Sequence, residues 1–163
     1  MGVGGRGNVR QAIPGWKART VELTHADRLN RLFAYYHARL EPELTEQAMA
    51  TIVGQALAHR DDYPDHYQVD PKLLVDVRKG KRDLPLDIAD AICDQVGAHR
   101  DYFRGPDREV HAIDQTLRLW TIARDLGLNH LACRSIDPEH IDFLINELTA
   151  ALDPSIASVT AIR

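Results

Sequence analysis

Apolar residues recur at intervals of three and four along most of the chain, which is the spacing of an amphipathic helix. The first such pattern begins after Thr24, whose side chain can form a capping box with Asp27, and it ends at Pro42. Its apolar positions are Leu29, Leu32, Phe33, Tyr36 and Leu40. A second helix, capped by Thr45, places on one face Met49, Ile52, Val53, Ala56 and Leu57. No useful stretch alternates as a strand does, so the pattern predicts an all-α fold.

A short third helix is predicted between Asp70 and Gly80. Asp70 is a good N-cap, Pro71 suits the first helical position, and Gly80 ends the helix after about two turns. Only Leu74 and Val77 face inward, and a helix this short is unstable alone, so neighbouring helices must hold it. A fourth helix follows over about 85–96, and the next aromatic pair, Tyr102 and Phe103, is expected to fold back onto the core.

The last third of the chain predicts two longer amphipathic helices, the first ending at Gly127 and the second starting at Asp137-Pro138. This segment has more apolar surface than two helices can hide between themselves, and pieces of this size seldom fold alone. It must therefore pack on the N-terminal domain, on a second copy of itself, or on both, and we expect a homodimer, open to higher-order assembly. The expected interface residues are Leu117, Trp120, Ile141, Leu144, Ile145 and Leu148.

The charge is distributed unevenly along the 163 residues. The net charge of −4 argues against a general nucleic-acid coat protein, but exposed charges more than about 8 Å apart are largely screened, so local clusters matter more. Residues 1–20 carry four cations, no acid and five of the ten glycines, which indicates a flexible basic arm. The third helix and its exit are also basic, whereas residues 106–153 are acidic.

A short basic helix, third in a set of four or five, is the organisation of a helix-turn-helix DNA reader. Its outward residues must be polar or basic to enter the major groove, and its inward face must be apolar. The expected DNA-binding residues are Lys72, Leu73, Asp76, Arg78, Lys79, Lys81 and Arg82. The expected organisation is a basic arm (1–22), a helix-turn-helix domain (23–105), a helical dimerisation domain (106–153) and a C-terminal tail (154–163).

Several motifs resemble the lambda-repressor (Xre) class of helix-turn-helix proteins, and within it the mycobacterial EspR regulators, which are nucleoid-associated transcription factors. The similar segments are Arg28-Leu-Asn-Arg-Leu-Phe33, the string from Leu74 to Arg82, and Asp101-Tyr-Phe103, then Leu119-Trp120, Arg124-Asp-Leu-Gly-Leu128 and Ala132-Cys-Arg134. The resemblance spans about residues 28–152. It implies a nucleoid-associated dimer that binds double-stranded DNA selectively through its reader domain and pairs through its C-terminal helices. The two cysteines, Cys93 and Cys133, fall in apolar helical patterns, where a free thiol acts as a small apolar group, and this favours a reducing, cytoplasmic location.

Two features depart from this class. The loop over 61–69 is longer than expected and carries Asp61, Asp62 and Asp65, which would repel phosphate. Asp76 cannot donate to a base acceptor, although it could accept from a cytosine amine or pair with a nearby arginine. These acids leave open a second interpretation, a protein-interaction module or antitoxin on a helix-turn-helix scaffold with weak or lost DNA binding.

Other classes of function find no support in the sequence. The eight histidines and two cysteines show no zinc-ligand spacing, and no nucleophile elbow, phosphate loop or paired-carboxylate pattern occurs. We therefore expect no metal, no cofactor and no enzymatic activity. There is no apolar run long enough to span a membrane, so no membrane partner is expected.

Overall fold

The computed structural model describes residues 22–128 and 138–152. Within these residues the chain forms seven helices and no strand, which confirms the all-α class. The helices are α1 (His25–Tyr35), α2 (Glu46–Ala58), α3 (Pro71–Arg78), α4 (Leu86–Val96), α5 (Asp101–Arg104), α6 (Asp107–Asp125) and α7 (Pro138–Leu152). The expected C-terminal tail, all but the last residue of the expected basic arm, and Cys133 lie outside the described residues.

The predicted helix starts are confirmed in their capping geometry. Thr24 and Asp27 form the capping box of α1, the Thr45 hydroxyl accepts from the backbone N–H of Ala48, and the Asp70 carboxylate accepts from that of Lys72. Each of these bonds satisfies an N–H group that the first helical turn leaves without a partner. The starts of the first three helices are therefore set by local sequence.

The first five helices surround one apolar core. Its fully buried members include Leu29, Leu32, Phe33, Met49, Leu57, Leu74, Ile92 and Tyr102. Tyr102 and Phe103 lie in α5 and are buried, as predicted. The core does not stop at the expected domain boundary near residue 105, because Val110 and Leu117 of α6 belong to it as well.

The first helix is shorter than predicted. It ends at Tyr35, and Tyr36, its C-cap residue, still packs against the core, whereas Leu40 is 94% exposed. A side chain from α6 stabilises this early end, because Arg124 Nη1 donates to the carbonyl oxygens of Ala34, Tyr35 and His37 at 2.9–3.1 Å. A guanidinium is favourable there because the carboxyl end of a helix carries partial negative charge.

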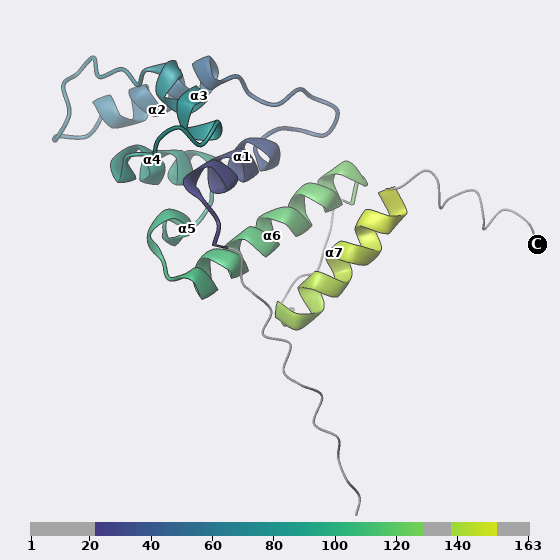
Figure 1. Ribbon diagram of the computed structural model, residues 1–163. Helices are drawn as coiled ribbons and strands as arrows, with labels where there is room; N and C mark the ends of the chain where they lie inside the picture. The colour runs from purple at the N-terminus through teal and green to yellow at the C-terminus, as the bar shows by residue number, and fades with distance from the viewer. Residues whose placement is uncertain (1–21, 129–137, 153–163) are drawn as a thin grey trace, which may run out of the picture.

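Helix α6 crosses beneath α1, and α7 lies beside α6 (Figure 1). Asp114 anchors the crossing: its Oδ1 lies 3.1 Å from Arg31 Nε and accepts a hydrogen bond of 2.6 Å from the Tyr102 hydroxyl. The contact between α6 and α7 buries Ile145 and includes a hydrogen bond of 2.8 Å from Gln115 to Asp142. Within the described ranges, no helix has the length and apolar character needed to cross a membrane.

Candidate nucleic-acid interface

The third helix is held by the helices on either side of it, as its length requires. Leu74 and Val77 are fully buried, and α3 packs on both α1 and α2. Gly80 ends it with φ +68°, a left-handed conformation that glycine adopts without steric cost. The backbone N–H of Lys81 then donates to the Asp76 carbonyl oxygen at 2.9 Å, which closes a Schellman-type turn. The chain therefore leaves α3 in a fixed direction.

Four of the predicted cations stay exposed around this helix: Lys72, Lys79, Lys81 and Arg82. Lys72 lies in the first turn, Lys79 caps the last, and the other two follow Gly80. Lys81 Nζ is 3.7 Å from Asp76 Oδ1, a loose pair in solvent, whereas the other three form no ion pair with a described residue. Flexible, solvated cations of this kind can exchange their counterions for the phosphates of a nucleic acid.

Arg78 is the exception, and the expectation that it contacts DNA needs correction. Its guanidinium makes ion pairs of 2.6 Å with Glu43 and 2.9 Å with Glu46, and its Nε donates to Asn30 Oδ1 at 2.7 Å. The guanidinium carbon also lies 4.3 Å from the centre of the Phe33 ring. A cation with two carboxylate partners and an aromatic face is committed to the fold, so Arg78 joins α3 to α1 and to the start of α2.

Two further residues predicted to contact DNA, Leu73 and Asp76, are only partly exposed. Leu73 is half-buried and packs against the core, which leaves one edge of its side chain in solvent. Asp76 is also half-buried, and its carboxylate faces Lys81. Pairing with a nearby cation was one of the alternatives predicted for Asp76, although an arginine was the expected partner.

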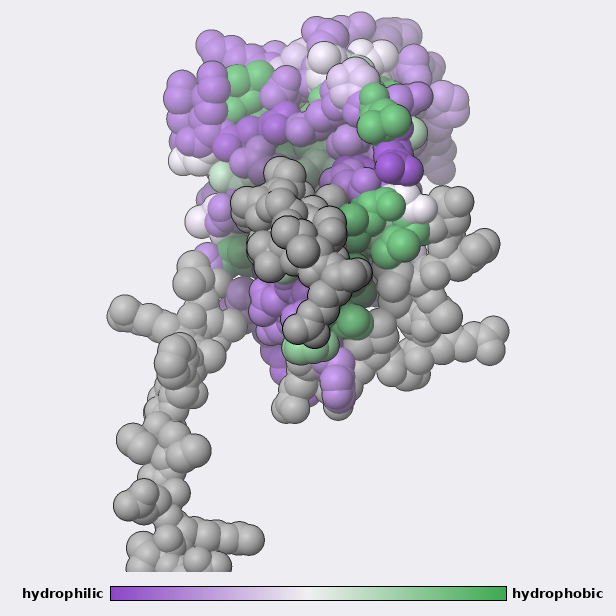
Figure 2. Space-filling model, turned by 90° about the vertical axis from the view of Figure 1, so that its right-hand side faces the viewer, coloured by the Kyte–Doolittle hydropathy of each residue, from purple (hydrophilic) through white to green (hydrophobic). Residues whose placement is uncertain are grey.

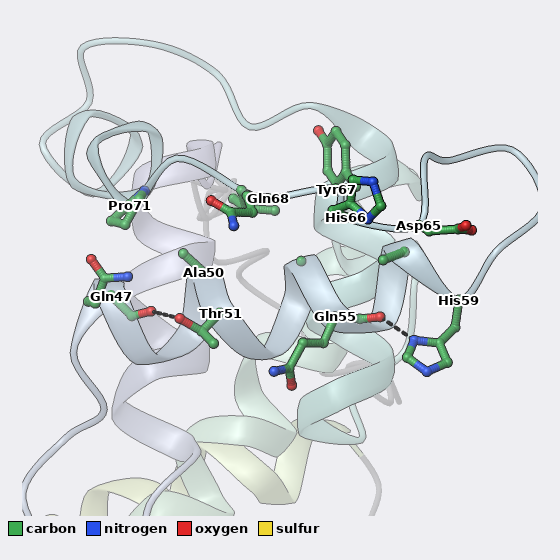
Figure 3. Close-up of a pocket in the computed structure, with 13 residues that line it drawn as sticks. Gln47, Ala50, Thr51, Gln55, His59, Asp65, His66, Tyr67, Gln68 and Pro71 are labelled. Atoms are coloured by element: carbon green, nitrogen blue, oxygen red, sulfur yellow. Dashed lines mark hydrogen bonds between the residues drawn. The ribbon is translucent and has the colours of Figure 1, made fainter.

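A polar groove that was not predicted from the sequence lies next to the start of α3. Gln47, Thr51 and Gln55 of α2 and its C-cap residue His59, each four residues apart, line one side, and the segment from Asp65 to Pro71 lines the other (Figure 3). Its volume is about 390 Å³. The spacing of four among these α2 residues was the available signal. Its side chains are mostly neutral hydrogen-bonding groups, so the groove supplies no large positive charge.

The acidic loop between α2 and α3 is fixed in place at three points. At Gly54 its backbone crosses α2 so closely that an added Cβ would lie 3.2 Å from Tyr67 O and Val69 N. The Tyr63 hydroxyl donates to the Asp87 carboxylate, and Arg60 lies 3.1 Å from Asp94. The hydrogen bond with Asp87 raises the pKa of Tyr63 to about 12, and it lowers the pKa of Asp87. Asp61, Asp62 and Asp65 remain exposed, and Asp65 lines the groove.

The predicted dimer-interface residues fall into two groups. Leu117 and Ile145 are buried within the single chain, so their side chains are not available to a partner, and this part of the expectation needs correction. Ile141, Leu144 and Leu148 are half-buried, and Trp120 is 38% exposed. Phe143, which is not among the predicted interface residues, is 61% exposed on α7. It is the largest exposed apolar side chain of that helix among the described residues.

Other chemistry has no assembled site in the described part of the chain. No group of three or more histidine, cysteine, aspartate or glutamate side chains is close enough there to hold a metal ion. Cys93 is buried, and burial raises the pKa of its thiol to about 12, so it remains protonated and unreactive at neutral pH.

Comparisons with protein-family models, with curated proteins and with solved structures found no match to this chain.

Proposed function

We propose that this chain is a DNA-binding transcriptional regulator or nucleoid-associated protein that acts as a homodimer. In this proposal α2 and α3 form a helix-turn-helix unit of the lambda-repressor type, and α3 enters the major groove of double-stranded DNA. The supporting observation is the short α3 itself, buried on one side and flanked by the exposed cations Lys72, Lys79, Lys81 and Arg82. The resemblance to the EspR regulators supports the same function, and with it a cytoplasmic, nucleoid-associated location.

In this proposal the exposed residues around α3 contact different parts of the DNA. Lys72 lies where the amino end of α3 would approach base edges or a phosphate, and Lys79, Lys81 and Arg82 lie where the chain would pass the sugar–phosphate backbone. Such backbone contacts position a protein on the duplex without reading its sequence. Sequence selectivity would then depend on Lys72, on Asp76, which accepts hydrogen bonds, and on the exposed edge of Leu73.

Binding of fluorescent duplex DNA over a salt series tests this function. Affinity that falls steeply with salt, together with preference for some sequences over others, would support it. Retention of full affinity at high salt would contradict it, because counterion release is the source of phosphate-driven binding.

The second candidate is a protein-interaction module or antitoxin built on the same scaffold. The observation that favours it is the neutralisation of Arg78 by Glu43 and Glu46, which leaves less positive charge near α3 than the sequence suggests. The exposed aspartates of the loop before α3 reduce the positive charge of this region further. Purification of the chain in a stoichiometric complex with one protein and without nucleic acid would support this candidate over the first.

A further inference from the structure

Leu40, in the turn between α1 and α2, combines two unfavourable features. Its backbone has a φ of +69°, which makes it the only non-glycine residue with a positive φ in the described part of the chain. Its side chain is also 94% exposed, the largest exposure of any big apolar residue described. A leucine in the left-handed region is strained by its Cβ, and an exposed one gains nothing from burial. Within a single chain, glycine or asparagine would suit this position better.

An apolar groove lies directly beside this residue. Its volume is about 630 Å³, and its apolar lining comes mainly from Tyr36, Ala38, Pro42, Leu44, Ile52 and Val96. Figure 2 faces the side from which the α1–α2 turn projects in Figure 1, and hydrophobic groups stand there among polar ones. The Leu40 side chain points to solvent and leaves the groove of its own chain open. The surface therefore carries a projecting apolar side chain and a recess next to it.

A projecting side chain with a recess beside it can form a symmetric interface with a second copy of the same surface. A two-fold axis beside the turn would place each Leu40 at the groove of the other copy, which is the arrangement of an isologous interface. The flanking charges fit the same arrangement, because Arg39 and Glu41, on either side of Leu40, have opposite signs. Glu41 lines the groove, and the Arg39 guanidinium packs against Gly127, just beyond the end of α6.

We propose that the α1–α2 turn is a self-association surface, in which Leu40 of one copy inserts into the groove beside Leu40 of a second copy. The groove is lined by no residue of α3, α6 or α7, although the turn contacts the end of α6 through Arg124. This surface adds an association step that depends neither on DNA nor on the C-terminal helices.

The substitution Leu40→Gly tests this proposal because it separates association from stability. Glycine removes the projecting side chain and relieves the backbone strain, so we expect a melting temperature no lower than that of the wild type. Sedimentation velocity over a range of concentrations should show one association step weakened by about tenfold or more, the usual effect of removing a central apolar anchor. A residue needed only for folding would give the opposite pattern, a lower melting temperature with unchanged association.

A substitution that fills the groove and a matched control substitution complete the experiment. Ala38→Trp fills the groove from an exposed position and should weaken the same step. Leu86→Ala removes another exposed leucine, 43% accessible and on a different helix, and should leave association unchanged. Wild-type assembly in both Leu40→Gly and Ala38→Trp would overturn the proposal, whether or not the chain binds DNA. Equal weakening by Leu86→Ala would overturn it too, because the effect would then not be specific to this surface.

Discussion

The guanidinium of Arg78 lies 2.6 Å from the carboxylate of Glu43, so the last residue of α3 is tied to the segment that leads into α2. Glu46 and Asn30 complete the contact from α2 and α1. One cation therefore connects three helices, and its charge is balanced within the chain. This relationship removes Arg78 from the predicted DNA contacts and gives it a part in fixing the orientation of α3.

Arg78→Ala should lower the free energy of unfolding by about 2 kcal/mol, because it removes charge-assisted hydrogen bonds from a partly buried site. The Arg78 side chain is only 22% exposed, so solvent screens these contacts incompletely. Urea denaturation measures the change. Arg82→Ala, which removes an exposed arginine four residues away, is the control and should change stability by less than about 0.5 kcal/mol. Equal stability of the two variants would contradict the assigned role of Arg78.

Gly54→Ala should destabilise the chain by about 1–3 kcal/mol and loosen the loop before α3, because the added Cβ lies 3.2 Å from two backbone atoms of that loop. Backbone atoms cannot move aside as a flexible side chain can. Hydrogen exchange should show faster exchange over residues 60–70 in the variant. Gln55→Ala, at the exposed neighbouring position, should leave exchange there unchanged. If Gly54→Ala also leaves exchange unchanged, the close crossing is absent in solution.

Tyr63→Phe should make the free energy of unfolding less dependent on pH, both in acid and in alkaline solution. The hydrogen bond from Tyr63 holds the pKa of Asp87 below its ordinary value of 3.8, so its contribution is present above that pH and lost as the pH falls through the folded value. The same bond raises the pKa of Tyr63 from 10.0 to about 12, so this contribution is present below pH 10 and lost as the pH rises toward 12.

The difference in unfolding free energy between the wild type and Tyr63→Phe should therefore be largest near neutral pH and shrink in strong acid and strong base. Urea denaturation at a series of pH values measures it. A difference that is constant with pH would mean that the hydroxyl and the Asp87 carboxylate do not interact.

Phe143→Asp is the sharpest test of the proposed pairing of C-terminal helices. Phe143 is 61% exposed on α7, so a charge there is tolerated by the single chain but disfavoured in an apolar interface. We expect the association step made through the C-terminal helices to be lost, whereas the step proposed for the α1–α2 turn should remain. Leu144→Asp combined with Leu148→Asp should do the same, although these half-buried residues also carry a greater risk to folding. A Phe143→Asp variant with the wild-type mass would place any dimer interface elsewhere.

Local patterns predicted much of the fold because caps and turns act over a few residues. Thr24, Thr45 and Asp70 begin their helices as predicted, and Gly80 ends α3. The end of α1 was predicted wrongly, because its position depends on Arg124, about 90 residues away in sequence. A residue this distant leaves no trace in the periodicity of α1 itself.

The candidate site could be predicted in outline but not in its details. The sequence identified the charge of each residue around α3, and Lys72 and Lys79 are exposed as expected. It could not separate Arg78 from them, because Glu43 and Asn30 reach Arg78 only through tertiary packing. In the same way, periodicity marked Leu117 and Ile145 as apolar but could not tell whether the same chain or a partner covers them.

The slope of log affinity against log salt for duplex DNA tests the central claim most directly. It should be compared among the wild type, Lys72→Ala with Lys79→Ala, and Arg108→Ala, an exposed cation of α6, as the control. If α3 faces the duplex, each lost phosphate contact should make the slope shallower by about 0.9, and the α6 control should match the wild type. An unchanged slope and affinity in the Lys72 and Lys79 variant would contradict the assignment of α3 as the DNA-binding helix.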